Sequence, residues 1–256
     1  MLQAILVGLA TSVAAMQHLD IVDGEVVPAQ LFPDYIALLV DDPRSEYRCT
    51  GSLISPWYIL TAAHCGENIR VAYLGANDAA GSDAKERHQL AARIVHPKFD
   101  FERTPYDFAL FKLENASKLT PVAISWDDDQ FNAPGVKAWI RGYGKIADRG
   151  PYATTLLQAE MTIDAFGPCN AALGEVHADS MICVGSKMKD PCDGDSGGPL
   201  TVTKNGQEQL VGVASWGPYQ CGTGLYVYGR LSAAKSFIDS VIPPPPSDCI
   251  QRPILS

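Results

Sequence analysis

The stretch "GDSGGPL", residues 194–200, places one serine, Ser196, among glycines. A free serine hydroxyl is a weak nucleophile, and it needs a base beside it, an acid behind the base and donors aimed at the developing oxyanion. Gly194, Gly197 and Gly198 permit a tight turn in which backbone N–H groups point at one spot. A purely structural glycine turn has the same letters, so Ser196 is a candidate nucleophile only if it has partners.

The order of the histidines excludes one familiar setting for such a serine. "GDSGG" also fits G-x-S-x-G, the nucleophile elbow of α/β-hydrolases, in which the acid and then the histidine follow the serine. The histidines are His18, His64, His88, His96 and His177, and all of them precede Ser196. The elbow interpretation therefore fails, and the base must come from upstream.

His64 in "LTAAHC" is the candidate base, because small residues at the end of a predicted strand leave an imidazole room to face a serine. The other histidines are poorer candidates: His18 precedes the expected mature domain, His88 lies in the charged run "KERHQL", and His96 and His177 look like loop residues. The candidate acid is Asp107 in "YDFALFKL", which would fix the orientation of the imidazole. The alternative for Asp107 is a capping residue at the start of a strand.

Short apolar runs separated by Gly, Pro, Asn and Asp clusters predict an all-β fold. Examples are "YIALLV", "FALFKL", "KAWIRGYG" and "LVGVASWG". The stretch "SAAKSFIDSVI", residues 232–242, has helical spacing and predicts a C-terminal helix with Ser232 as its N-cap. Residues 243–256 begin with four prolines, which cannot continue a helix, and predict an extended tail.

The composition limits the partners and the compartment. With 256 residues and 46% hydrophobic content the chain can bury a full core. Its formal charge of −9 and the absence of a Lys/Arg cluster argue against a nucleic-acid partner. Residues 2–15 are apolar and end in Val13-Ala14-Ala15, which predicts a signal peptide over residues 1–15 rather than a fold helix or a membrane anchor. We therefore expect a secreted, extracellular protein without a membrane partner.

"TAAHC", "DFAL" and "GDSGGPL", in the order His, Asp, Ser, resemble the chymotrypsin/trypsin-like serine peptidase family, and within it the trypsin-like subgroup, from residue 21 to about residue 242. The resemblance implies two six-stranded antiparallel β-barrels, about residues 21–125 and 126–231, with the active site between them and a C-terminal α-helix. It also implies hydrolysis of peptide bonds through an acyl-enzyme without a cofactor. Ser196 would be the nucleophile, His64 the base and Asp107 its orienting acid, with the N–H groups of Gly194 and Ser196 as the oxyanion hole.

Seven cysteines fit an oxidising compartment, and they contain no C-x-x-C pair that would suggest zinc. Six cysteines allow 15 connectivities, and spacing alone does not choose among them. The resemblance implies the pairs Cys49–Cys65, Cys169–Cys183 and Cys192–Cys221. Cys249 is then the odd one, which is free, capped or linked to another chain.

The resemblance also assigns a substrate pocket. Asp190 matches an acid at the pocket floor that favours Arg or Lys, and Gly217 and Gly224 match walls that must be small. Ser215, Trp216 and Gly217 would form the edge that pairs with substrate backbone, with Ser215 also supporting Asp107. Three departures from the pattern bear on the Arg/Lys preference: Pro191 stands where a small or hydroxylated residue is usual, the loop at residues 222–223 is short, and Asp193 adds negative charge at the rim.

The sequence "IVDG" from Ile21 resembles the start of a mature peptidase, with residues 16–20 as a propeptide and the new ammonium of Ile21 pairing with Asp195. The preceding residue is Asp20, which an Arg/Lys-specific enzyme does not cleave after. We therefore expect a different activating protease.

Two further stretches bear on glycosylation and on metal binding. "NAS" at Asn115 is a glycosylation sequon, and Ala76 at the first ligand position of the segment that binds calcium in some relatives argues against a metal.

Expected partners are protein or peptide substrates, the activating protease, protein inhibitors and a disulfide partner of Cys249. The alternative functions are a non-catalytic homologue that binds or inhibits a partner enzyme, and a secreted disulfide-rich structural module.

Overall fold

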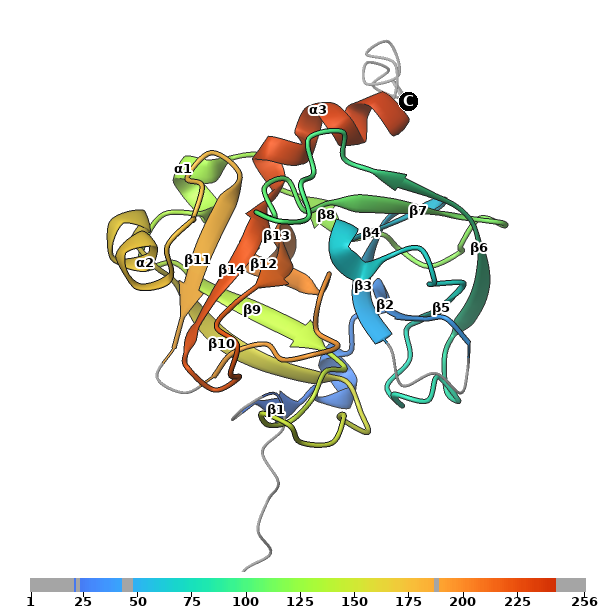
Figure 1. Ribbon diagram of the computed structural model, residues 1–256. Helices are drawn as coiled ribbons and strands as arrows, with labels where there is room; N and C mark the ends of the chain where they lie inside the picture. The colour runs from blue at the N-terminus through green and yellow to red at the C-terminus, as the bar shows by residue number, and fades with distance from the viewer. Residues whose placement is uncertain (1–20, 22–23, 43–47, 187–188, 243–256) are drawn as a thin grey trace, which may run out of the picture.

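A computed structural model describes residues 21, 24–42, 48–186 and 189–242. The predicted signal peptide (1–15), propeptide (16–20) and tail (243–256), together with Cys249, lie outside the described residues. The described part contains two antiparallel β-barrels that lie side by side, one built from the first half of the chain and one from the second (Figure 1). The expected all-β architecture of two six-stranded barrels is confirmed.

The first barrel closes in the strand order β2-β3-β4-β7-β6-β5. Its core is dense with buried aliphatic and aromatic side chains such as Leu38, Leu53, Leu60 and Phe111, and burial of these side chains is the main favourable term in its folding. The strands are β2 (Ile36–Val40), β3 (Arg48–Ser55), β4 (Tyr58–Thr61), β5 (Val71–Leu74), β6 (Glu86–Val95) and β7 (Ala109–Leu113).

The second barrel follows the order β9-β12-β13-β14-β11-β10 and closes through the β10–β9 pair. Its strands are β9 (Lys137–Gly142), β10 (Leu157–Ile163), β11 (Met181–Gly185), β12 (Pro199–Lys204), β13 (Gln207–Trp216) and β14 (Leu225–Arg230). Two short strands attach to it, β1 (Glu25–Val26) beside β10 and β8 (Ala123–Ile124) beside β13. The first barrel, expected over about residues 21–125, is therefore shorter at both ends, because β1 and β8 join the second barrel's sheet.

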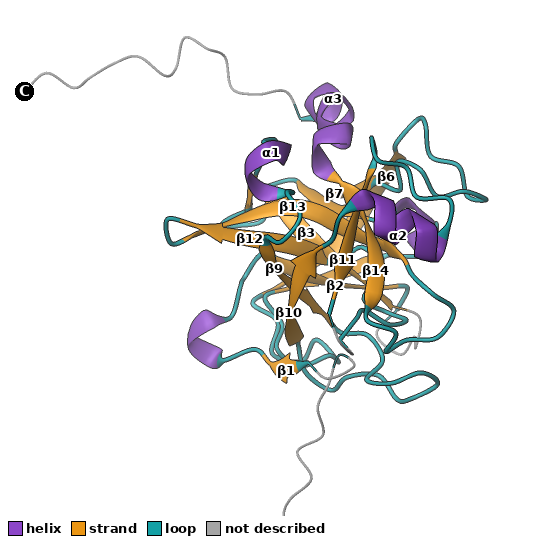
Figure 2. Ribbon diagram, turned by 90° about the vertical axis from the view of Figure 1, so that its left-hand side faces the viewer, coloured by secondary structure: helices purple, strands orange, loops and turns teal. Residues whose placement is uncertain are grey.

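The helices are α1 (Asp128–Phe131), α2 (Phe166–Leu173) and α3 (Leu231–Val241), with 3₁₀ turns at Ala29–Leu31 and Ala63–Cys65. The predicted C-terminal helix is present as α3, and it lies at the same end of the molecule as α1 (Figure 2). Its predicted N-cap is wrong, because the helix begins at Leu231 after Arg230, and no side chain caps it. The Ser232 hydroxyl instead donates to Asp128 at the start of α1, at 2.5 Å.

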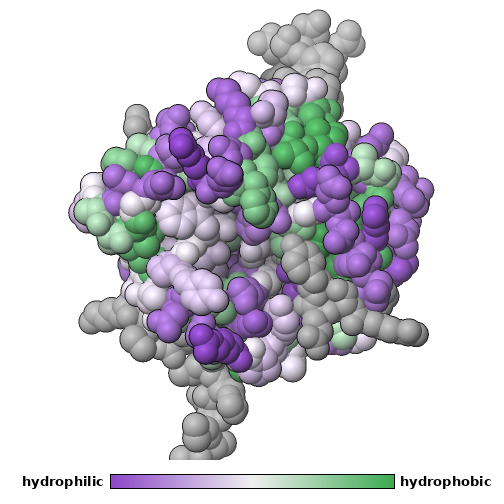
Figure 3. Space-filling view, in the orientation of Figure 1, coloured by the Kyte–Doolittle hydropathy of each residue, from purple (hydrophilic) through white to green (hydrophobic). Residues whose placement is uncertain are grey.

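The three disulfides implied by the resemblance are confirmed: Cys49–Cys65, Cys169–Cys183 and Cys192–Cys221. On the face seen in Figure 3, hydrophilic side chains predominate and apolar ones form separate patches. Within the described ranges, no helix combines the length and the apolar character that crossing a bilayer requires.

Candidate active site

His64 lies in the 3₁₀ turn Ala63–Cys65, which follows directly after β4. The disulfide to Cys49 ties this turn to β3, and the guanidinium of Arg93 on β6 donates to the Ala63 carbonyl. The preceding alanines, Ala62 and Ala63, are buried, so their small side chains let the turn lie close against the barrel. The imidazole is thereby held at the barrel edge with 23% of its side chain exposed.

Asp107 lies just before β7, is 1% exposed and accepts three hydrogen bonds. The backbone N–H of His64 donates to Oδ1 at 2.9 Å, and the ring Nδ1 of His64 lies 2.7 Å from Oδ2. The Ser215 hydroxyl donates to Oδ2 at 2.6 Å. A carboxylate in this position favours the proton on Nδ1, which leaves Nε2 of His64 as the free acceptor.

Ser215 reaches Asp107 from the other barrel. Strand β13 pairs with β14, and their register shifts between Ala214 and Trp216. Such a bulge re-aims a side chain that regular alternation would place elsewhere. The hydrogen bond from Ser215 therefore joins the two barrels at the carboxylate.

Ser196 lies in the turn before β12, next to the His64 turn. Its carbonyl accepts the Thr50 N–H at 2.8 Å and lies 3.6 Å from the sulfur of Cys65. Gly197 has φ +80°, and a Cβ there would lie 1.9 Å from the Thr61 hydroxyl, so only glycine fits. No hydrogen bond joins the Ser196 hydroxyl to the His64 ring, both of which are described, so the two groups must approach each other before a proton can pass between them.

The backbone N–H groups of Gly194 and Ser196 donate to no group in the part of the chain that the structure describes. The turn is held from behind by Asp195, whose carboxylate accepts the N–H groups of Gly144 at 2.8 Å and Cys192 at 3.0 Å. Donors held without a partner beside a serine are what an oxyanion hole requires.

The family model "Trypsin" matches residues 21–238. The chain belongs to the trypsin family. A trypsin of Saccharopolyspora erythraea is 30% identical over 219 residues, which cover 83% of this chain and 94% of that protein. Coagulation factor XI of Bos taurus is 32% identical over 199 residues, which cover 73% of this chain and 32% of that longer protein.

A solved structure shows the same relationship. Neuropsin, a serine protease expressed in the limbic system of mouse brain, superposes with a TM-score of 0.75 at 28% identity, covering 86% of this chain and 99% of neuropsin. Together with the family match, these likenesses identify a trypsin-like serine endopeptidase. Its substrates are accordingly proteins.

A cavity of about 500 Å³ opens beside Ser196 in this trypsin-family chain. The walls come from the segment around the Cys192–Cys221 disulfide and from the edge of β13, and include Pro191, Ser215, Gly217 and Tyr226. Tyr226 was missed by sequence reasoning. Its ring packs so closely on Gly217 that a Cβ there would lie 2.3 Å from Cδ2 of the ring. The signal that could have pointed to Tyr226 is its position on β14, two residues after Gly224.

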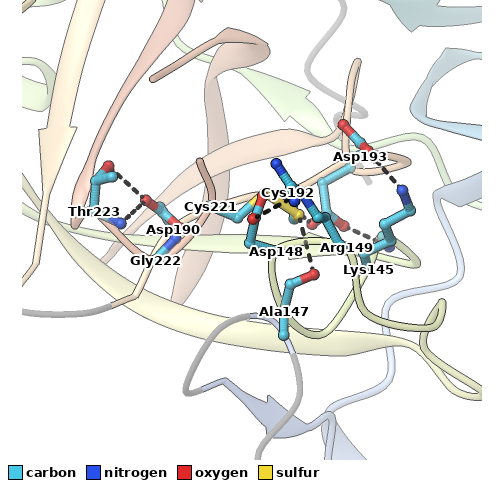
Figure 4. Close-up of a disulfide and its surroundings, with 12 residues drawn as sticks. Lys145, Ala147, Asp148, Arg149, Asp190, Cys192, Asp193, Cys221, Gly222 and Thr223 are labelled. Carbon is cyan, nitrogen blue, oxygen red and sulfur yellow. Dashed lines mark hydrogen bonds and ion pairs between the residues drawn. A yellow bond between two sulfur atoms is a disulfide. The ribbon is translucent and has the colours of Figure 1, made fainter. Parts of the chain in front are cut away.

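Charged residues border the mouth of this cavity. Lys145 pairs with Asp193 at 2.8 Å, and Arg149 lies 3.7 Å from Asp148. Figure 4 shows this group at one end of the Cys192–Cys221 disulfide, with Asp190, Gly222 and Thr223 at the other end. The expected negative charge of Asp193 is thus partly offset by Lys145.

Asp190 is 1% exposed and does not border the cavity. Its carboxylate accepts hydrogen bonds from the N–H groups of Gly222, Thr223 and Gly224 and from the Thr223 hydroxyl, at 2.5 to 3.1 Å. Gly224 therefore acts on Asp190 directly, through its N–H group. Trp216 lies at the end of β13, and its indole N–H is buried without a partner among the described residues.

Asp195 and Ile21, the predicted activation pair, are both buried. Burial raises the pKa of Asp195 to about 7, even though the N–H groups of Cys192 and Gly144 act in the opposite direction. In the continuous chain Ile21 is an internal residue with no α-ammonium, and it packs into the core of the second barrel. No group of three or more His, Cys, Asp or Glu side chains suited to a metal ion occurs among the described residues.

Proposed function

We propose that this chain cleaves peptide bonds through an acyl-enzyme formed on Ser196. The observation that carries the proposal is the Ser215–Asp107–His64 chain of hydrogen bonds, which leaves Nε2 of His64 as an acceptor beside the serine turn. Nε2 removes the Ser196 proton as Oγ attacks the carbonyl carbon, and the N–H groups of Gly194 and Ser196 stabilise the oxyanion. Nε2 then returns the proton to the leaving amine, and water releases the acyl group by the same steps in reverse.

We propose further that cleavage follows Arg or Lys. Support comes from the Asp190 carboxylate, which directly precedes the cavity-lining residues Pro191 and Cys192 and favours a cationic side chain by charge. At the mouth, Lys145 and Arg149 offset the charges of Asp193 and Asp148. The wall at Gly217 carries no side chain that would block a long substrate residue, whereas Gly224 is buried behind the cavity and donates to Asp190.

The chain is proposed to be secreted as a zymogen. Three disulfides support an oxidising compartment, and the exposed Asn115 lies in a bend where a glycan can be attached. Cleavage before Ile21, by a protease that cuts after Asp20, would create an α-ammonium group that can pair with the Asp195 carboxylate. N-terminal sequencing of the purified zymogen after prolonged incubation tests this, because self-cleavage at Ile21 would contradict it.

The peptidase proposal is tested with the full chain, in which residues 16–20 are replaced by a sequence that an added protease cuts to expose Ile21. Peptide amides ending in Arg, Lys, Phe or Ala before the scissile bond are compared. We expect turnover that falls by on the order of 10⁴-fold in Ser196→Ala. Turnover that is absent, or that Ser196→Ala leaves unchanged, would overturn the proposal.

A further inference from the structure

The loop Gly222-Thr223-Gly224 surrounds the Asp190 carboxylate. Gly222 and Gly224 have φ of +86° and +81°, and this backbone turns three successive N–H groups toward the anion. Successive N–H groups arranged in this way form a concave anion site. The negative charge of Asp190 is thus already solvated by the protein before any substrate arrives.

The hydrogen-bonding capacity of Asp190 is nearly filled. A carboxylate offers about four lone-pair sites, and four donors already occupy this one. Oδ2 alone accepts the N–H of Thr223 at 2.9 Å, its hydroxyl at 3.1 Å and the N–H of Gly224 at 3.0 Å. Oδ1 accepts only the N–H of Gly222, so it is at Oδ2 that a guanidinium or ammonium group must displace one of these donors to make direct contact.

The four donors differ in how easily they can be displaced. Three are backbone N–H groups fixed by the loop, whereas the Thr223 hydroxyl sits on an exposed side chain and can rotate away. Tyr226 lies on the cavity side and packs against Gly217, while Asp190 does not border the cavity. The Thr223 hydroxyl is thus the one donor to Asp190 that a side-chain substitution can remove.

We propose that Thr223 is a specificity-determining residue, because its hydroxyl competes with the substrate cation for Asp190 and so weakens discrimination between charged and neutral side chains. This inference rests on the proposed preference for Arg and Lys. According to this inference, the enzyme accepts Arg and Lys. It discriminates them from neutral side chains less strongly than an enzyme whose Asp190 carboxylate had no hydroxyl donor.

The test uses two peptide amides that differ only in having Arg or citrulline, its uncharged isostere, before the scissile bond. The ratio of kcat/KM for Arg over citrulline reports how strongly the charge is read. In Thr223→Val, which keeps the shape and removes the hydroxyl, we expect this ratio to rise about fivefold or more. Thr223→Ser, which keeps the hydroxyl, should retain the wild-type ratio.

Asp190→Asn completes a double-mutant cycle. It should lower the ratio more in the Thr223→Val background than in the wild type, because the carboxylate is more open to the substrate once the hydroxyl is gone. An unchanged or lower ratio in Thr223→Val, or an equal effect of Asp190→Asn in both backgrounds, would overturn the inference.

Binding of benzamidine separates this inference from the peptidase proposal. Calorimetry measures this binding without turnover, on the Ser196→Ala chain cleaved before Ile21. Uncharged benzamide is the control ligand. Thr223→Val should tighten benzamidine binding about fivefold and leave benzamide unchanged. If the chain with Ser196 shows no turnover but benzamidine binding changes as expected, the peptidase proposal alone is refuted. If Thr223→Val leaves benzamidine binding unchanged, the role of Thr223 is refuted.

Discussion

Asp107 is the residue on which the geometry of the site depends most directly, because it collects donors from both barrels. A hydrogen bond to a charged group typically contributes about 1.5 to 3 kcal/mol. Without the Ser215 hydroxyl, Oδ2 would keep only the imidazole, and the carboxylate would orient the ring less firmly. Ser215 therefore has a positioning role that should appear in the chemical step.

We expect Ser215→Ala to lower kcat about tenfold and to change KM little, because the substrate is still bound by the same walls. Steady-state kinetics on a peptide amide would measure both. Ser240→Ala, which removes a hydroxyl that donates to the Phe237 carbonyl on α3, serves as the control and should leave kcat unchanged. A tenfold rise in KM at constant kcat would contradict the positioning role.

The candidate triad could be predicted from the sequence because each of its members carries a local signal and their order excludes the rival elbow. The hydrogen bonds that the loop at residues 222–224 donates to the Asp190 carboxylate carry no such signal. They depend on the positive φ of Gly222 and Gly224, which converts a short loop into an anion site. Sequence spacing shows that the loop is short but not which way its N–H groups point.

At the scale of elements, α3 connects the C-terminal half of the chain to the core of the first barrel. Phe237 and Ile238 belong to the same buried cluster as the residues of β2 to β7. The ring of Phe237 also lies 5.0 Å from that of His96, edge to face, and His96 stacks on Tyr106 at 4.9 Å. His96, expected only as a loop residue, is thus buried beneath the helix.

Phe237→Ala should cost about 3 kcal/mol of unfolding free energy, since it leaves a cavity between α3 and the barrel. Urea unfolding followed by fluorescence measures the loss. The matched control is Lys235→Ala on the exposed face of the same helix, where the i,i+4 pair with Asp239 contributes little. Equal losses in the two variants would show that α3 does not stabilise the barrel.

The helix also shows why boundaries are harder to predict than elements. The apolar spacing of "SAAKSFIDSVI" predicts a helix, and Ser232 has the side chain of an N-cap. The N-cap is Arg230, two residues earlier, because Leu231 is fully buried as the first helical residue, while the Ser232 hydroxyl donates to Asp128. Tertiary contacts thus overrode a local preference that the sequence alone displays.

Across the whole molecule, polar contacts hold the barrels in a fixed relation around the site. Besides the Ser215–Asp107 hydrogen bond, the Tyr35 hydroxyl beside the first barrel donates to Glu208 on β13 at 2.9 Å. Glu208 also pairs with Arg141 on β9. Because His64 and Asp107 come from one barrel and Ser196 from the other, the alignment of the site depends on these contacts between barrels.

Activation should reveal itself in how the stability of the whole molecule depends on pH. In the uncleaved chain burial raises the pKa of Asp195 from 3.8 to about 7. Between about pH 4 and pH 7 the unfolded chain has lost this proton while the folded chain retains it. The contribution of Asp195 to the free energy of unfolding is therefore fully present below about pH 4. As the pH rises to about 7, this contribution is lost and the free energy of unfolding falls by about 4 kcal/mol.

Cleavage before Ile21 should remove this loss, because the new ammonium stabilises the ionised carboxylate. Urea unfolding of the uncleaved and cleaved chains between about pH 4 and pH 7 measures the difference. His96, whose pKa is lowered by burial, destabilises both forms as pH falls and cancels in the comparison. Asp195→Asn should abolish the excess pH dependence of the uncleaved form. Identical pH profiles before and after cleavage would show that the Ile21 ammonium does not reach Asp195.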